Sequence, residues 1–345
     1  MLTDASLNAI LERIPRLTIG VVGDLFLDRY LDIDATLTEP SLETGLDAYQ
    51  VTRVRSQPGA AGTVLNNLAA LGIRSAPTIS LIGDDGEGYE LRQALDRLRI
   101  VDARHVISWP GRRTPTYTKP MLESPGQPAR ELNRLDIKNR TSTPHDAEVR
   151  ILSALDEITP RVDALLILDQ VSEDDCGVVP RRVRDRLAQL GAKHPDKPLL
   201  ADSRARIGLF RNVWLKPNES ECARAVMGVA AGPDHVRHCA IELARRCNRP
   251  VVCTCGADGI LVVDSRIACE RVVQVPAYPV SGLIDIVGAG DSTSAGIACA
   301  LAAGATLPEA AAFGNLVASI TIRQIGTTGT ATREQVRQRW QEVRA

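Results

Sequence analysis

Asp285-Ile286-Val287-Gly288-Ala289-Gly290-Asp291 runs directly into an alanine-rich segment, Ser292 to Ala303, which we expect to be a helix. The first N–H groups of a helix have no intrahelical acceptor, and the helix dipole places partial positive charge at that end. The amides of Gly288, Ala289 and Gly290 can therefore receive an anion such as a phosphate. Asp291, beside that anion, would be a poor phosphate ligand but a suitable base for a hydroxyl that attacks phosphorus. The alternative is a glycine turn with Asp291 as an ordinary N-cap.

The composition is that of a globular protein with no strong charge. The chain has 345 residues, of which 44% are hydrophobic and 3% aromatic, and its net charge is -1. This balance does not favour nucleic acid or an anionic membrane as a partner. Residues 1–16 carry acidic side chains inside a helical apolar pattern, unlike a signal peptide, and no apolar run is long enough to span a bilayer. We therefore expect a cytoplasmic protein without nucleic-acid or membrane partners.

The cysteines do not indicate a metal site. The chain has eight, with no Cys-x-x-Cys pair, and only Cys253 and Cys255 lie close together in the sequence. Reduced thiols in the core are the favoured interpretation for all of them, including Cys269. We expect no zinc site.

Strands and helices alternate along most of the chain, which predicts a doubly wound α/β domain with a mostly parallel sheet. Residues 17–22 are almost wholly apolar, as expected for a strand covered on both faces, and Gly23-Asp24 follows. Asp24 and Asp28 thus lie at a carboxyl strand end, where ligands bind in such sheets. Either carboxylate could instead cap a turn.

Two segments break this alternation and predict a separate small sheet. In residues 29–58 and 109–137 apolar and polar side chains alternate, as in strands with one solvated face. We expect these segments to form a β lid on a main domain made of residues 1–28, 59–108 and 138–345.

Two further turns could face a nucleotide and its metal ion. Asn218 and Glu221 follow a strand that ends at Lys216, and their spacing places both on one helical face. An amide oxygen and a carboxylate so placed could hold hydrated magnesium, although the same spacing fits a capping box. Residues 256–259 form a glycine turn between two strands, which could lie against a nucleotide or be a simple hairpin.

Four motifs, in this order and spacing, resemble the ribokinase-like (PfkB) sugar kinase family. They are Gly23-Asp24 to Asp28, the helix from Gly59 to Gly72, Asn218 to Glu221, and Asp285 to Asp291. The resemblance covers nearly the whole chain. It implies an ATP- and Mg²⁺-dependent kinase that phosphorylates a hydroxyl of a sugar or sugar phosphate under a small β lid.

The resemblance also implies roles for individual residues. Asp291 would be the catalytic base, Gly288, Ala289 and Gly290 the anion hole, and Asn218 with Glu221 the magnesium site, with the ion held through water. The sugar site would comprise Asp24, Asp28, Gly59, Ala60 and Thr63. The nucleotide site would comprise Lys216, Asn218, Thr254, Gly256, Gly259 and Asn315. Backbone carbonyls around Asp285 could hold a monovalent cation such as K⁺.

Within the family, residues 23–30 and 134–136 look most like the kinase part of ADP-heptose synthases, which phosphorylates a heptose 7-phosphate at its anomeric hydroxyl. Lys119 and Arg134 could contact such a sugar phosphate. For Lys119 alone, a solvated sheet face is the favoured interpretation.

Three departures from the family pattern leave the substrate open. Ile286 stands where the family usually has Thr, Ala60 stands where it usually has a second Gly, and Thr63 stands where it often has Asn. A kinase for ribose, a ketohexose or a nucleoside is therefore an alternative, as is a catalytically silent sugar-binding regulator.

The lid also predicts an oligomeric state. Small sheets are marginally stable alone, and the resembled heptose kinases pair their lids across a dimer. Apolar lid positions that could meet a second copy are Tyr30, Leu31, Ile33, Val51, Val54 and Met121. We expect a homodimer; the alternative is a lid that folds onto its own active site.

Overall fold

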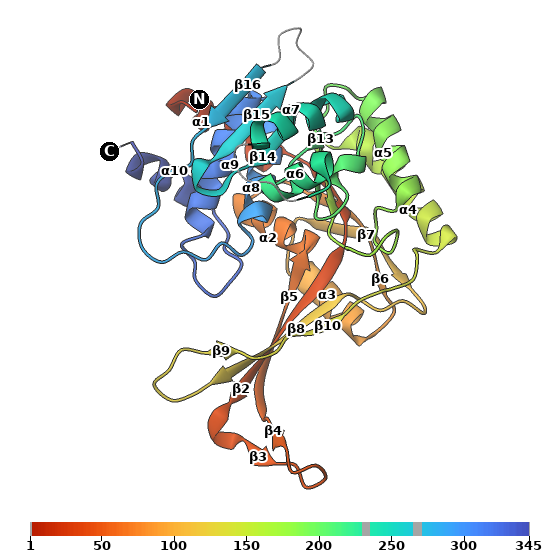
Figure 1. Cartoon of the computed structure of the whole chain (residues 1–345), viewed down its shortest axis with the longest axis vertical. Helices are drawn as coiled ribbons and strands as arrows, with labels where there is room; N and C mark the ends of the chain where they lie inside the picture. The colour runs from red at the N-terminus through yellow and green to blue at the C-terminus, as the bar shows by residue number, and fades with distance from the viewer. Residues whose placement is uncertain (1, 230–234, 265–270, 345) are drawn as a thin grey trace.

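A nine-stranded, mostly parallel sheet forms the centre of the computed structural model, which describes residues 2–229, 235–264 and 271–344 (Figure 1). The strand order is β16-β15-β14-β13-β12-β11-β1-β6-β7, and of the pairs described within this sheet only β14–β15 and β15–β16 are antiparallel. The strands are β1 (Ile19–Gly23), β6 (Ala76–Gly83), β7 (Val101–Trp109), β11 (Ala164–Asp169), β12 (Leu199–Ser203), β13 (Trp214–Leu215), β14 (Val251–Thr254), β15 (Ile260–Asp264) and β16 (Arg271–Val275). All residues of β1 and β11 are buried, because helices cover both faces.

The helices divide between the two faces of this sheet and form two hydrophobic cores. One core contains α1 (Asp4–Arg13), α2 (Ala61–Leu71), α3 (Gly86–Asp96), α8 (Ala289–Ala302), α9 (Leu307–Thr321) and α10 (Arg333–Glu342). The other contains α4 (His145–Ile158), α5 (Arg181–Lys193), α6 (Glu219–Met227) and α7 (Val236–Cys247). This arrangement confirms the predicted doubly wound α/β fold.

A second, smaller sheet is the predicted lid, and it projects from the α/β body as a long twisted ribbon (Figure 1). Its strands are β2 (Leu25–Asp34), β5 (Val51–Ala60), β8 (Thr116–Glu123), β9 (Arg130–Glu131) and β10 (Leu135–Ile137), and a short hairpin of β3 (Glu39–Pro40) and β4 (Asp47–Ala48) lies at the tip. β2 pairs antiparallel with β5 and parallel with β8. The apolar lid positions expected to meet a second copy differ in exposure. Val51 and Val54 are exposed, whereas Ile33 is buried, so the expectation that Ile33 contacts a second copy is wrong.

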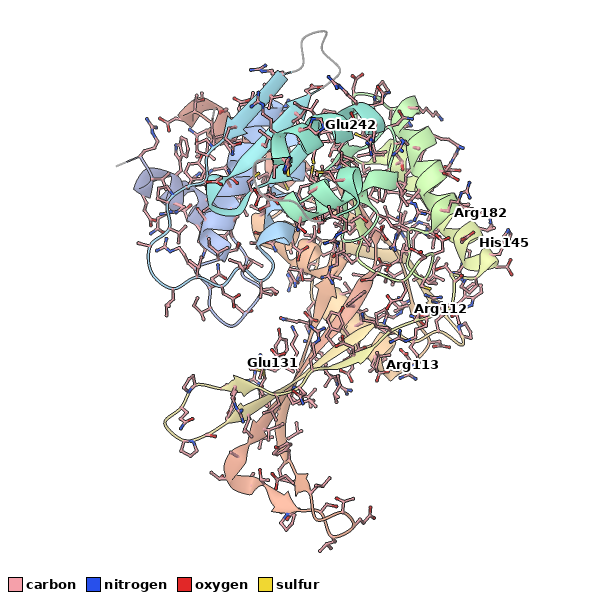
Figure 2. All side chains as sticks on the ribbon, viewed as in Figure 1. Arg112, Arg113, Glu131, His145, Arg182 and Glu242 are labelled. Atoms are coloured by element: carbon pink, nitrogen blue, oxygen red, sulfur yellow. The ribbon has the colours of Figure 1, made fainter. Side chains whose placement is uncertain are left out.

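Hydrogen bonds and an ion pair hold the base of the lid where the chain passes from β7 to β8. The Arg112 guanidinium donates to the Cys176 carbonyl oxygen at 2.6 Å, and Arg113 Nη2 lies 3.0 Å from Glu87 Oε2 on α3. Figure 2 shows Arg112 and Arg113 at this junction and Glu131 farther out on the lid. The Asp85 carboxylate accepts hydrogen bonds from the N–H and the hydroxyl of Thr114, the residue that follows Arg113. The start of the lid strand is therefore anchored to the N-terminus of α3.

The cysteines and helices agree with the composition. The seven cysteines within the described residues are unpaired and buried, as expected of core thiols, while Cys269 lies outside the described residues. None of the helices in the described part of the chain has the length and apolar character needed to cross a membrane.

Candidate active site

The N-terminus of α8 is built around Gly288. This residue is the N-cap and has a left-handed backbone (φ 79°, ψ 2°), which glycine adopts without a steric penalty. Asp291 is the third residue after the N-cap and lies in the first turn of the helix, so the alternative of Asp291 as an ordinary N-cap is wrong. The Ala289 N–H donates to the Ile286 carbonyl oxygen at 3.1 Å. Among the described residues, the amides of Gly288, Gly290 and Asp291 donate to no acceptor, so they are the groups left to bind an anion, whereas the predicted use of the Ala289 amide conflicts with its bond to Ile286.

Asp291 has the environment of a general base. Its carboxylate forms no hydrogen bond with any described residue, and the residue is only partly accessible. Burial and the nearby Asp202 carboxylate raise its pKa to about 7, opposed by the positive charges of Lys216 and Arg204. A carboxylate with a pKa near neutrality accepts a proton far more readily than an ordinary aspartate.

Lys216 places a buried positive charge beside the anion-binding turn. It follows β13 and is 3% exposed, and its Nζ lies 2.9 Å from Asp202 Oδ2. The Ser294 hydroxyl of α8 donates to the same Asp202 oxygen at 3.1 Å. A Cβ atom added at Gly290 would lie 3.8 Å from Lys216 Nζ, so the ammonium approaches the exposed end of α8. These contacts join β12, β13 and α8 at the carboxyl edge of the sheet.

Asn218 and Glu221 form a complete capping box at the start of α6. Asn218 Oδ1 accepts from the Glu221 N–H, and Glu221 Oε2 accepts from the Asn218 N–H, both at 2.8 Å. Burial and the Asp202 carboxylate raise the pKa of Glu221. Glu221 Oε1 has no partner among the described residues, so one carboxylate oxygen stays open for a hydrated metal ion. The capping box is therefore present, and it leaves the magnesium role as a prediction.

The nucleotide-loop residues lie together beside this capping box. An isolated parallel bridge joins Asn218 to Thr254, and the Thr254 N–H donates to the Pro217 carbonyl oxygen. Gly259 has a positive φ of 89°, and a Cβ there would lie 2.2 Å from the Val275 carbonyl oxygen. Gly256 also has a positive φ, 52°. The turn thus has the close backbone packing that glycine permits, and its nucleotide contact stays a prediction.

Asn315 and Asp285 are both committed to structural hydrogen bonds. The Asn315 amide donates to the carbonyl oxygens of Val275 and Pro276, which ties α9 to the end of β16. The Asp285 carboxylate accepts from the N–H groups of Val287 and Gly326, each at 3.0 Å. Asp285 therefore holds two loops together near the N-terminus of α8, and a monovalent cation there stays a prediction.

On the sugar side, Asp24 and Asp28 have different surroundings. Asp24 is 2% exposed and accepts from the N–H groups of Gln170, Val171 and Val178 at 2.7–3.1 Å. Burial and the Asp169 carboxylate raise its pKa to about 6. Asp24 is thus a buried tie between β1 and the loop after β11, and sequence reasoning did not foresee that role.

Asp28 lies on the lid strand β2 and carries a buried carboxylate. Lys119 Nζ lies 3.7 Å from Asp28 Oδ2 and 3.2 Å from the Tyr30 hydroxyl, and the Lys119 side chain is only 14% exposed. The expectation of a solvated sheet face for Lys119 is therefore wrong. A Cβ at Gly59 would lie 2.8 Å from the Asp28 carboxyl carbon, so glycine is needed for this packing. Burial raises the pKa of Asp28, opposed by the charge of Lys119.

The remaining predicted sugar residues lie at the start of α2 and in the lid. Ala60 is the N-cap of α2 and has φ 52° and ψ -117°, a conformation unfavourable for alanine. Thr63 is buried, and its methyl group would contact a Cβ added at Gly288. Arg134 lies over the Tyr117 ring at 4.0 Å and pairs with Asp136 at 2.6 Å. The start of α2 thus meets the start of α8.

Comparison with known proteins identifies the family. Residues 25–333 match the model of the pfkB family of carbohydrate kinases. The chain belongs to this family. Its members are phosphotransferases with an alcohol group as acceptor, and the family kinases use ATP.

The curated relatives of this pfkB kinase include longer proteins. It is 31% identical over 331 residues to the bifunctional protein HldE of Rhodospirillum rubrum, covering 93% of this chain and 62% of that protein. For HldE of Paramagnetospirillum magneticum the identity is 27% over 334 residues, covering 93% and 63%. The chain thus spans less than two thirds of the length of these relatives.

Solved structures with higher sequence divergence share the fold. Arabidopsis thaliana ribokinase complexed with ribose and ATP superposes with a TM-score of 0.67 at 16% identity, covering 94% of this chain and 98% of that chain. Escherichia coli phosphofructokinase-2 in complex with potassium gives 0.68 at 21% identity, covering 95% and 100%. These likenesses establish the ribokinase-like fold with its lid.

Sequence reasoning missed two charged residues of the candidate site, Asp202 and Arg204. Asp202 pairs with Lys216, and its charge acts on Glu221 and Asp291. Arg204 comes directly after β12. The signal that singled out Asp24, a charged residue at the carboxyl end of a buried strand, applies equally to both.

Proposed function

We propose that this protein is an ATP- and Mg²⁺-dependent kinase that transfers the γ-phosphoryl group of ATP to a hydroxyl of a sugar phosphate, with a heptose 7-phosphate as first candidate. The observation that carries the proposal is the placement of Asp291. Its unpaired carboxylate lies beside the open amides of α8, with Lys216 next to them and Asp28 across the site. One carboxylate can thus take a proton while the amides beside it bind an anion.

In the proposed reaction Asp291 accepts the proton of the acceptor hydroxyl as its oxygen attacks phosphorus. The amides of Gly290 and Asp291 and the Lys216 ammonium then stabilise negative charge on the transferring group. Asp28 accepts hydrogen bonds from sugar hydroxyls, and Gly59, which packs against Asp28, and Ala60, the N-cap of α2, border the sugar. Asp24 supports this site by fixing the loop after β11.

The residues at the start of α6 suit a water-bridged magnesium ion. The described ranges contain no group of three or more His, Cys, Asp or Glu side chains that could hold a metal. A metal ion in this part of the chain would therefore need water or substrate oxygens among its ligands. Mg²⁺ typically keeps several waters and binds through one or two carboxylates and substrate phosphates, where it neutralises phosphate charge. Glu221 Oε1, with Asn218 beside it, supplies such a partner.

The choice of a sugar phosphate rests on the lid. Lys119 and Arg134 bring two positive charges near Asp28, and both lower the pKa of that carboxyl group. Residues 23–30 and 134–136, which resemble the kinase part of ADP-heptose synthases, contain Asp28 and Arg134. A phosphate on the sugar would lie against these cations, with the reacting hydroxyl toward Asp291.

The test is an ATP-consumption assay with purified protein and a panel of acceptors. The panel contains D-glycero-D-manno-heptose 7-phosphate, fructose 6-phosphate, ribose, fructose and a nucleoside. We expect turnover with the heptose phosphate and, with every unphosphorylated acceptor, a much lower kcat/KM. Turnover of ribose or a nucleoside alone would replace the proposed substrate, and binding of sugars without ATP consumption would favour a silent regulator.

A further inference from the structure

The carboxyl edge of the sheet carries one arginine that no predicted role uses. Arg204 directly follows β12, which lies between β13 and β11 in the strand order. β13 leads into Lys216 and Glu221, whereas β11 is followed by β1, which leads to Asp24 and Asp28. Arg204 therefore extends from the strand between the proposed phosphate side and the proposed sugar side.

Arg204 differs from the other cations of this region because its charge is not committed. Lys119 pairs with Asp28, Arg134 with Asp136, Lys216 with Asp202, and Arg206 with Asp169. The Arg204 side chain is exposed, and within the described residues its guanidinium has no hydrogen-bond or ion-pair partner. Its backbone is fixed, because the Arg204 N–H donates to the Asp169 carbonyl oxygen at 3.2 Å. A tethered, unpaired guanidinium suits an anionic ligand.

The contacts at the end of β12 indicate where that ligand lies. Asp202, two residues before Arg204, pairs with Lys216 at 2.9 Å and accepts from the Ser294 hydroxyl of α8 at 3.1 Å, so this strand end lies beside the start of α8. In an in-line transfer to a hydroxyl held near Asp291, the phosphoryl group passes along this end of α8. A phosphate carried by the sugar would instead lie toward Lys119 and Arg134 in the lid.

We propose that Arg204 is a catalytic residue whose guanidinium binds the equatorial oxygens of the phosphoryl group during its transfer. Lys216 is largely neutralised by Asp202, so a second cation is needed to balance the charge that spreads over these oxygens. The planar fork of arginine matches two such oxygens at once, which lysine does not. This inference rests on the proposed kinase function and adds a residue to its transition state.

The experiment compares Arg204→Gln and Arg204→Lys with the parent protein in steady-state kinetics, using the acceptor found in the panel. Arg150→Gln is the matched control, since Arg150 is an exposed arginine on α4. We expect Arg204→Gln to lower kcat by about 10²-fold, the usual cost of removing one transition-state donor, with KM for ATP and acceptor changed by less than about threefold. Arg204→Lys should recover part of kcat, and Arg150→Gln should match the parent.

Each other outcome overturns a defined part of the proposal. An unchanged kcat in Arg204→Gln would overturn the inference and leave the kinase function intact. A raised KM for a phosphorylated acceptor with unchanged kcat would also overturn it, because Arg204 would then bind the sugar phosphate. A parent protein that neither binds Mg·ATP by calorimetry nor consumes ATP with any acceptor would overturn the proposed function and this inference with it.

Discussion

At the scale of single residues, the raised pKa of Asp291 determines the pH dependence of the reaction. Its value of about 7 means that the base is largely protonated below neutrality. We expect kcat/KM to rise with pH and to level off above about pH 8, since only the ionised carboxylate accepts a proton. The measurement is a kcat/KM profile at constant ionic strength. A flat profile between about pH 6 and about pH 8 would show that Asp291 is not the base.

The same pKa predicts an effect on stability. Because the folded-state pKa lies above that of an unfolded aspartate, the folded protein binds more protons between those two values, and ionisation of Asp291 destabilises it as pH rises through this window. Asp291→Asn removes this cost. We expect the Tm of Asp291→Asn to exceed that of the parent at pH 8 and the difference to shrink near pH 4. A lower Tm for the variant at pH 8 would contradict the buried, uncompensated environment.

Ala60 is strained where the family usually has glycine. Its φ of 52° and ψ of -117° are unfavourable for a residue with a Cβ atom. We expect Ala60→Gly to raise the free energy of unfolding by about 1 kcal/mol, measured by urea denaturation. Ala69→Gly, in the interior of α2, is the control and should lower it by about 1 kcal/mol. Equal destabilisation by both changes would show that Ala60 carries no strain.

At the scale of elements, the start of α6 combines a capping box with the proposed magnesium contact, and one substitution separates them. Glutamine can still accept the Asn218 N–H, so Glu221→Gln keeps the cap while removing the charge. We expect nearly unchanged Tm and an increase of about tenfold or more in the Mg²⁺ concentration for half-maximal rate. A sharp fall in Tm with an unchanged Mg²⁺ requirement would reduce Glu221 to a helix cap.

The sequence predicted the parts of the site that lie within one element, but not the contacts between neighbouring strands. The α8 turn and the α6 start were predictable because each motif is local and its geometry follows from helix termini. The position of Lys119 was not, because it depends on the parallel pairing of β2 with β8, which sets Tyr30 opposite Lys119. The Asp202–Lys216 pair likewise depends on β12 and β13 being neighbours in the sheet. Contacts that arise from strand order cannot be read from spacing along the chain.

At the scale of the whole molecule, the lid extends from the body with apolar side chains exposed. Val51 is 44% exposed and Val54 is 51% exposed. We expect a homodimer in which the lids cover these positions, measured by light scattering. Val54→Lys should produce monomers, whereas Val149→Lys, at an exposed valine of α4, should not. A monomer at micromolar concentration that is active at full rate would contradict the proposed dimer.

The alternation of strands and helices in the sequence was sufficient to predict the α/β body and its lid. The substrate was not predictable, because the residues that depart from the family pattern, Ala60, Thr63 and Ile286, lie at or beside the proposed sugar and phosphate sites. Thr63 and Gly288 come together from α2 and α8, so a change in one alters the packing of the other. Substrate choice therefore depends on how α2 and α8 pack together, and residues taken one at a time along the sequence do not reveal it.

The most direct test of the account is the activity of Asp291→Asn at saturating ATP and acceptor. Removal of the base should lower turnover by about 10²- to 10⁴-fold, while Mg·ATP binding measured by calorimetry stays close to that of the parent. Asparagine keeps the size of the side chain, so the N-terminus of α8 should be preserved. A variant that retained most of the parent activity would contradict the assignment of Asp291 and the mechanism built on it.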